Sequence, residues 1–164
     1  MTGETYIIGI VGGSGSGKTS LVRSLKDIVA EDVSFISLDD YYHPREEQLT
    51  DKNGINNFDR PESIDSKALV TDILALKSGK SVSRPQYTFN NKLATSTTII
   101  TNPARVIVVE GLFIFHYIEI MNLLDLKVYI DAKEELRIIR RIKRDQAERN
   151  YPIDDVMYLS LIHI

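Results

Sequence analysis

The chain has 164 residues and contains no cysteine. This absence excludes disulfides, thiolate metal sites and a cysteine nucleophile, and it fits a reducing compartment. Long hydrophobic runs are missing too. The apolar run near the N-terminus, Tyr6 to Val11, is interrupted by Gly9 and is far shorter than a signal-peptide core or a membrane span. We therefore expect a cytoplasmic protein with no membrane partner.

The sequence also lacks a strong excess of charge of one sign. Its 20 Lys and Arg residues stand against 23 Asp and Glu residues, which gives a formal net charge of -3. The molecule as a whole therefore has no electrostatic reason to bind nucleic acid, and any anion site must be local. Hydrophobic residues make up 43% of the chain, which is enough to bury the core of one domain with a small insertion.

Short apolar runs typical of strands alternate with amphipathic patterns typical of helices. We predict strands at residues 6–11, 33–38, 106–110 and 126–130, and helices at residues 18–30, 63–77 and 133–150. This alternation indicates an α/β fold with a doubly wound, mostly parallel sheet and helices on both of its faces.

Two details refine the predicted architecture. The strands at 6–11 and 106–110 are apolar on both sides, so they are expected in the middle of the sheet. Residues 80–102 are polar, Thr-rich and aromatic instead, and we predict an inserted β-hairpin there.

A glycine-rich loop joins the first predicted strand to the first predicted helix. Its sequence, Gly12-Gly-Ser-Gly-Ser-Gly17-Lys18-Thr19, fits the pattern G-x-x-x-x-G-K-[ST]. Glycines let several backbone N–H groups turn inward around phosphate oxygens, and the helix N-terminus adds partial positive charge. The alternative is a flexible Gly/Ser turn. We predict a P-loop NTPase-type fold whose nucleotide ligands are Gly12, Gly13, Ser14, Gly15, Ser16, Gly17, Lys18, Thr19 and Ser20.

The chemistry expected at such a loop decides which other residues matter. Lys18 would reach the β and γ phosphates, and the Thr19 hydroxyl would bind Mg²⁺. A guanine-reading N-K-x-D motif is lacking, because Asn91-Lys-Leu-Ala94 has no aspartate, so GTP specificity is disfavoured. A kinase needs instead a carboxylate near the acceptor hydroxyl, a second near the metal, and positive charge over the transferred phosphoryl group.

Two carboxylates follow predicted parallel strands, where open α/β sheets place their ligands. Asp39 comes directly after the second strand. Its alternative role is a helix or turn cap, which Asp40 fits equally well. Glu110 ends the strand at 106–110 and is either solvated at the sheet edge or a metal ligand.

The last predicted helix is rich in arginine. Arg137, Arg141 and Arg144 share one face of it, and we expect another face to be anchored by the apolar Leu136, Ile139 and Ile142. The arginines either stabilise a phosphoryl transition state or form a solvated surface with pairs such as Asp145 and Arg149.

Several segments, taken together in this order and spacing, resemble the uridine kinase (uridine–cytidine kinase) family, P-loop kinases related to phosphoribulokinase and pantothenate kinase. They run over nearly the whole chain and comprise Gly12–Thr19, Ser37–Tyr42, Asn57–Pro61, Pro85–Phe89, Val108–Gly111, Asp125–Asp131 and Arg140–Arg149.

The resemblance implies transfer of the γ-phosphate of ATP, with GTP a less expected donor, to the 5′-hydroxyl of uridine or cytidine in pyrimidine salvage. It also implies Mg²⁺ as cofactor and a homotetramer. The implied catalytic residues are Asp39 (general base), Lys18, Arg141 and Arg144, and Arg149 would join the nucleotide ligands. The implied metal ligands are Thr19, Glu110 and Asp39. The implied substrate ligands are Asp39, Tyr42, Phe58, Asp59 (ribose hydroxyls), Tyr87, Phe89, Lys92 and Arg141.

The chain also departs from the pattern that it resembles. Thr88 and Lys92 stand where the family has an aspartate and a base-reading histidine, and Tyr151 replaces a second lid arginine. A related kinase for another nucleoside or a sugar phosphate is therefore an alternative. A nucleotide-binding regulatory protein is a third, which Asp39, Glu110 and the arginines argue against.

The C-terminal part of the chain matches the family less well. We expect one nucleoside kinase domain at residues 1–158, with the hairpin at 80–102 and an arginine-rich lid at 133–150. Leu159–Ile164 departs from the family pattern, so we expect a non-native tail there. The final strand of the family fold would then be missing, which would leave the strand at 126–130 as an open edge.

Overall fold

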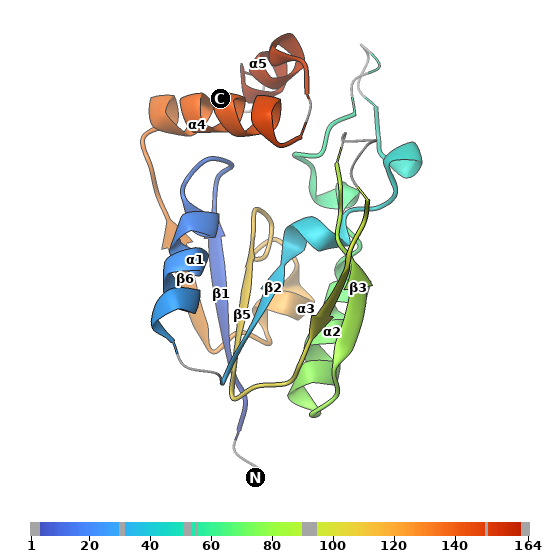
Figure 1. The fold of residues 1–164 in the computed structure, drawn as a ribbon, viewed down its shortest axis with the longest axis vertical. Coiled ribbons are helices and arrows are strands. Elements are labelled where there is room, and N and C mark those ends of the chain that lie inside the picture. Colours follow the sequence, from blue (N-terminus) through green and yellow to red (C-terminus); the bar gives the residue numbers. More distant parts are fainter. Residues whose placement is uncertain are drawn as a thin grey trace.

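The computed structural model describes residues 4–29, 32–50, 54, 56–89, 95–149 and 151–161. Its centre is a parallel sheet with the strand order β2-β5-β1-β6 (Figure 1). The strands are β1 (Tyr6–Gly12), β2 (Val33–Ser37), β5 (Val106–Gly111) and β6 (Leu126–Ile130). The predicted α/β fold is confirmed, and β1 and β5 lie in the middle of the sheet as expected.

The remaining elements surround this sheet. The α-helices are α1 (Lys18–Ile28), α2 (Ser66–Lys77), α3 (Ile118–Met121), α4 (Glu134–Ala147) and α5 (Ile153–Leu161). Short 3-10 helices are η1 (Leu38–Tyr41), η2 (Arg45–Glu47) and η3 (Pro61–Ser63). The predicted hairpin is an antiparallel pair, β3 (Val82–Pro85) and β4 (Thr98–Thr101).

Alternate side chains of the central strands enter two cores on opposite faces of the sheet. On one face, Ile7 and Ile107 pack with Leu69 and Ile73 of α2 and with Ile120 of α3. On the other face, a smaller core joins the strands to α1 and comprises Ile10, Val22 and Val108. The helices therefore cover both faces, which is why these strands are apolar throughout.

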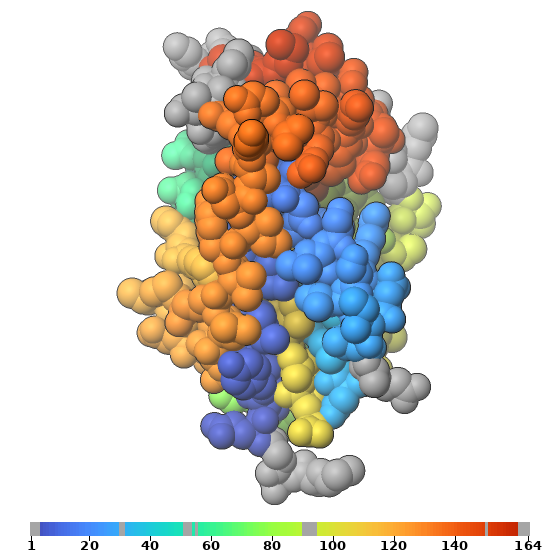
Figure 2. All heavy atoms as spheres, turned by 90° about the vertical axis from the view of Figure 1, so that its left-hand side faces the viewer, coloured from blue at the N-terminus to red at the C-terminus, as the bar shows by residue number. Residues whose placement is uncertain are grey.

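Helices α4 and α5 lie over the carboxyl ends of the strands (Figure 1). In the space-filling view, the orange atoms of α4 sit directly against the blue atoms of the N-terminal segment (Figure 2). The expected apolar anchor of α4 is wrong in part, because Leu136 and Ile139 are 46% and 51% exposed. The helix is attached to the domain through its charged face instead.

The start of helix α2 differs from the prediction. Helix α2 begins at Ser66, three residues later than expected, because the Asp65 carboxylate accepts a hydrogen bond from Ala68 N (2.9 Å) and caps the helix.

Strand β6 is an edge of the sheet among the described strands. Leu159 and Ser160 are buried in α5, and the expectation of a non-native tail remains a prediction. Among the described residues, no helix has the length and apolarity needed to cross a membrane.

A polar cluster attaches the hairpin to the rest of the domain. The carboxylate of Asp72, on α2, accepts hydrogen bonds from the Tyr41 hydroxyl (2.9 Å) and from Nε and Nη2 of Arg84 (3.0 and 2.8 Å). The Arg84 guanidinium also stacks on the Tyr41 ring, 3.9 Å from its centroid. Since Tyr41 ends η1 and Arg84 lies on β3, this carboxylate holds the hairpin beside the segment that carries Asp39.

We predict that Asp72→Ala lowers the free energy of unfolding by about 1–3 kcal/mol, because it leaves a partly buried hydroxyl and guanidinium without their acceptor. Urea denaturation measures the change. The matched control is Asp32→Ala, which removes an exposed partner of Arg105 and should cost less than about 1 kcal/mol. Equal losses in the two variants would contradict the role given to Asp72.

Candidate active site

The phosphate-binding loop (P-loop, Gly12–Thr19) leaves the end of β1 and enters α1. Gly15 and Gly17 have φ angles of 77° and 106°, a region that side chains disfavour. The Lys18 ammonium folds back over the loop and donates hydrogen bonds to the carbonyl oxygens of Gly12 (2.7 Å) and Gly13 (3.2 Å). Thr19 and Ser20 lie exposed in the first turn of α1, and Ser16 is buried.

The arginine-rich helix α4 lies directly on this loop. Arg144 Nη2 donates to Ser14 Oγ (3.0 Å), and Arg137 Nε contacts the Ser14 carbonyl oxygen (3.5 Å). A Cβ atom on Gly13 would overlap the Arg137 guanidinium, and one on Gly15 would overlap the Arg137 backbone. The loop therefore needs glycine both for its own conformation and for the close approach of α4.

Positive charge is concentrated around the P-loop. Burial lowers the pKa of Lys18, and the nearby Arg144 and Arg137 lower it further, while Glu110 and Asp39 act in the opposite direction. An anionic group placed among these cations would relieve their mutual repulsion and favour the charged ammonium. The residues present thus fit a polyphosphate at this place.

Two carboxylates stand beside Lys18 at the ends of β2 and β5. Glu110 accepts a hydrogen bond at Oε1 from Ser37 Oγ (2.8 Å), its neighbour across the parallel register. Burial raises the pKa of Glu110, the charge of Asp39 raises it further, and Ser37 and Lys18 oppose the shift. Glu110 is therefore half-buried and hydrogen-bonded at the end of its strand. Carboxylate oxygens are the ligands that Mg²⁺ prefers, so the chemistry of Glu110 and Asp39 suits a magnesium ion, and the role of the Thr19 hydroxyl remains a prediction.

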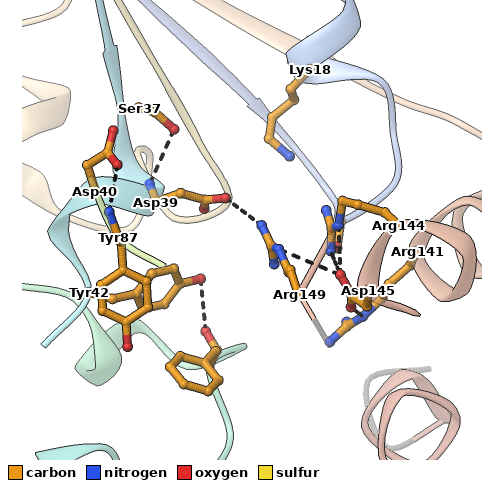
Figure 3. Close-up of polar contacts among 12 residues, drawn as sticks. Lys18, Ser37, Asp39, Asp40, Tyr42, Tyr87, Arg141, Arg144, Asp145 and Arg149 are labelled. Carbon is orange, nitrogen blue, oxygen red and sulfur yellow. Dashed lines mark hydrogen bonds and ion pairs between the residues drawn. The ribbon is translucent and has the colours of Figure 1, made fainter. Parts of the chain in front are cut away.

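Asp145 organises the arginines of α4 and of the segment directly after it (Figure 3). Its side chain accepts a hydrogen bond from Arg144 Nε (2.7 Å) and pairs with Arg141 Nε (3.5 Å) and Arg149 Nε (3.7 Å). The residue is only 3% exposed, and a buried carboxylate is tolerated because three guanidinium groups surround it. The predicted pair of Asp145 and Arg149 is present, but it is part of this larger cluster.

The same arginines reach the two predicted substrate carboxylates. Arg149 Nη2 donates to Asp39 Oδ2 (2.7 Å) (Figure 3), and its guanidinium stacks 3.6 Å from the centroid of the Phe89 ring. Arg141 forms an ion pair with Asp59. Residues from the sheet edge, from the hairpin and from α4 are thereby brought to one place.

A cavity of about 270 Å³ lies between α4, α5 and the part of the chain that carries Tyr42 and Phe58. Aromatic side chains gather on it: Tyr42 lies 5.4 Å from Phe58 and 5.6 Å from Phe89, ring centroid to ring centroid. Burial raises the pKa of Tyr42 well above its ordinary value. The lining residues are Tyr42, Arg45, Gly54, Asn56, Phe58, Asp59, Phe89, Arg141, Asp145, Arg149, Tyr151, Pro152, Asp155, Val156 and Leu159.

Two predicted substrate ligands, Tyr87 and Lys92, are absent from the described lining of this cavity. Tyr87 packs against Tyr42 and Phe89 at 5.3 and 5.0 Å, but it is outside the cavity lining, and its hydroxyl donates to the backbone oxygen of His43 (3.3 Å). Lys92 lies outside the described residues.

Sequence reasoning missed several residues that shape the site. The sequence analysis does not predict Ser37 as the partner of Glu110. Both residues stand at the ends of predicted strands, and this shared position could have indicated the contact. Arg45 and Tyr151 line the cavity, yet Arg45 belongs to no motif and Tyr151 was noted only as a departure. Asp40 is bound by the backbone N–H of Tyr87 (3.2 Å) instead of acting as a helix cap.

Comparison with known proteins gives consistent matches. Residues 7–162 match the family described as phosphoribulokinase / uridine kinase. A protein named uridine kinase from Halobacterium salinarum is 36% identical over 164 residues, 99% of this chain and 73% of that protein. One of the same name from Macrococcus caseolyticus is 38% identical, over 97% of this chain and 79% of that protein.

Solved structures share the fold at lower identity. A structure described as a possible uridine kinase from Bacillus stearothermophilus has a TM-score of 0.64 and 22% identity, covering 90% of this chain and 85% of that one. Phosphoribulokinase from Rhodobacter spheroides has a TM-score of 0.65 and 16% identity, covering 98% of this chain and 65% of that one.

We predict a pH-dependent stability difference between the wild-type protein and Glu110→Gln. Because the folded-state pKa of Glu110 is raised, folding favours the protonated carboxyl, and this contribution is lost as pH rises through the raised pKa. The unfolding free energy of wild type minus that of the variant should therefore fall with rising pH. Urea denaturation at a series of pH values measures it, with the exposed Glu119→Gln as control. A difference that rises with pH would contradict the assignment.

We also predict that Asp145→Asn lowers the free energy of unfolding by about 3 kcal/mol, because it removes the buried carboxylate that three partly buried guanidinium groups share. The exposed Asp154→Asn is the matched control. A double-mutant cycle of Asp145→Asn with Arg149→Gln should give a coupling energy of about 1 kcal/mol or more. Strict additivity in that cycle would show that Asp145 does not hold Arg149.

Proposed function

The chain belongs to the phosphoribulokinase / uridine kinase family, phosphotransferases that act on a hydroxyl group, and from this premise we propose its substrates. We propose that it transfers the γ-phosphate of ATP to the 5′-hydroxyl of a pyrimidine ribonucleoside, uridine above all, with Mg²⁺ as cofactor. The observation that carries the proposal is the position of Asp39 between Lys18 of the P-loop and Tyr42 of the aromatic cavity (Figure 3).

The cations around the P-loop suit phosphoryl transfer. Lys18, Arg144 and Arg149 surround the place where the γ-phosphate would lie, and Arg137 and Arg140 contact the loop carbonyls from above. Charge in the transition state is spread over the phosphoryl oxygens, so fixed guanidinium groups stabilise it without reorganising. Mg²⁺, when bound by Glu110, Asp39 and Thr19, would add positive charge beside the same oxygens.

Asp39 is the proposed general base. Its carboxylate would accept the proton of the substrate 5′-hydroxyl as the oxygen bonds to phosphorus, a demand that stays small until that bond has largely formed. Its main work is therefore to orient the hydroxyl. Arg149, bonded to the same carboxylate, keeps the aspartate aimed at the phosphate site.

The nucleoside would occupy the cavity beside Asp39. Phe58 and Phe89 offer faces for stacking the base, with Tyr42 and Tyr87 packed behind or beside them. Asp59 and Arg141 would hold the ribose hydroxyls, since a carboxylate accepts both and a missing hydroxyl leaves it unpaired. The proposal extends to pyrimidine salvage in the cytoplasm and to a homo-oligomer, a tetramer in the form that the family resemblance implies.

The test is a coupled assay of ADP release over uridine, cytidine, adenosine and a sugar phosphate. We predict that Asp39→Asn lowers kcat for uridine by at least about a hundredfold and leaves ATP affinity nearly unchanged. The matched control is the adjacent Asp40→Asn, which should stay near wild type. Lys18→Ala should weaken ATP binding as well as turnover.

Two outcomes would contradict the proposal. Turnover of Asp39→Asn at the wild-type rate would remove the assigned base. A wild-type protein that phosphorylates the sugar phosphate and neither pyrimidine nucleoside would place it elsewhere in the family.

A further inference from the structure

The nucleoside cavity contains two polar atoms that the proposed mechanism leaves unused. Nη1 of Arg45 and the hydroxyl oxygen of Tyr151 are both buried, and neither has a hydrogen-bond partner among the described residues. Both residues line the cavity. Buried polar groups normally have partners, so two such atoms in one cavity indicate a ligand group that supplies them.

Local contacts hold the Tyr151 ring and the Arg45 backbone at this cavity. The Tyr151 ring packs edge-on against Phe58, with 6.1 Å between centroids, and its backbone N–H donates to the Asp145 carbonyl oxygen (3.1 Å). The Arg45 carbonyl oxygen accepts from Gln48 N (3.2 Å) and Asn56 Nδ2 (3.4 Å). Burial raises the pKa of Tyr151, with the Arg45 charge opposing the shift, so the phenol keeps its proton and can donate a hydrogen bond.

The polar groups of Tyr87, a predicted substrate ligand, are already engaged. The Tyr87 hydroxyl donates to the His43 backbone (3.3 Å), and the Tyr87 N–H donates to Asp40 (3.2 Å). Asn56 and Asp155 also line the cavity, but among the described residues Arg45 and Tyr151 contribute the buried donors that have no partner and no role in the proposed mechanism.

We propose that Arg45 and Tyr151 together read the O4 carbonyl of the pyrimidine and make the protein select uracil over cytosine. The inference rests on the proposed function, which anchors the ribose at Asp39 and Asp59. O4 is the polar atom of uracil farthest from the glycosidic nitrogen, so it faces the cavity wall away from those carboxylates.

The donor and acceptor chemistry gives the preference its direction. Guanidinium groups only donate hydrogen bonds, and a phenol donates one. Uracil O4 accepts both, whereas cytosine presents an amino group that donates at that place. With cytidine, the guanidinium and the phenol would face the cytosine amino group, which is also a donor, and all of these donors would lack an acceptor. Leaving buried donors without an acceptor costs more free energy than a weak hydrogen bond would contribute.

The experiment compares kcat/KM for uridine and cytidine in wild type, Arg45→Met and Tyr151→Phe. The wild-type ratio should favour uridine by at least about tenfold, and each variant should reduce that ratio by about tenfold, mainly through uridine. The ratio is taken on one preparation, so loss of folded protein cancels. Arg105→Met and Tyr129→Phe are matched controls, because these residues are 82% (side chain) and 65% exposed.

The outcomes separate the inference from the function on which it rests. Turnover of neither nucleoside by wild type overturns both. Turnover of both with a ratio near one, a preference for cytidine, or an unchanged ratio in Arg45→Met and Tyr151→Phe overturns the inference alone and leaves the kinase assignment standing.

Discussion

The buried carboxylate of Asp145 is the constraint on which the site depends. Without it, Arg141 and Arg144 of α4 and Arg149, just after α4, would repel one another on one side of a segment that has little apolar attachment to the domain. With it, each guanidinium keeps a free edge that points toward the P-loop or toward Asp39 and Asp59. The same guanidinium groups therefore supply the positive charge for the chemistry and the contacts that position α4. They can do both because one acidic side chain neutralises part of their charge and fixes their directions.

Parallel strands supply the second half of the arrangement. Their carboxyl ends meet at one edge, so Lys18, Asp39 and Glu110 gather there although they are distant in sequence. Burial pushes the pKa of Lys18 down and that of Glu110 up, while each opposes the shift of the other. Burial thus disfavours the charged forms of both side chains. Phosphate oxygens beside Lys18 and a divalent cation beside Glu110 would favour those charged forms, and a metal-bound nucleotide has this distribution of charge.

Much of this could be predicted from the sequence, for identifiable reasons. The strands, the hairpin and the P-loop follow from local patterns: β-rich runs, a change of composition at 80–102, and fixed glycine spacing. The attachment of α4 could not be predicted this way, because Leu136 and Ile139 have helical spacing but face away from the domain. Apolar periodicity identifies a face of a helix, and it does not say whether that face or the charged one finds a partner.

Residues that act through contacts distant in sequence were the hardest to predict. Arg45 and Tyr151 are 106 positions apart by their numbers, and neither stands in a motif, yet both line the same cavity, where the Tyr151 ring packs against Phe58. A base-reading role moves easily between such positions, since any buried donor on the cavity wall can satisfy a carbonyl. The P-loop and Asp39 cannot move in this way, because backbone geometry and the line of phosphoryl transfer fix them. Family resemblance therefore predicts the chemistry of this chain better than it predicts the base that the chain selects.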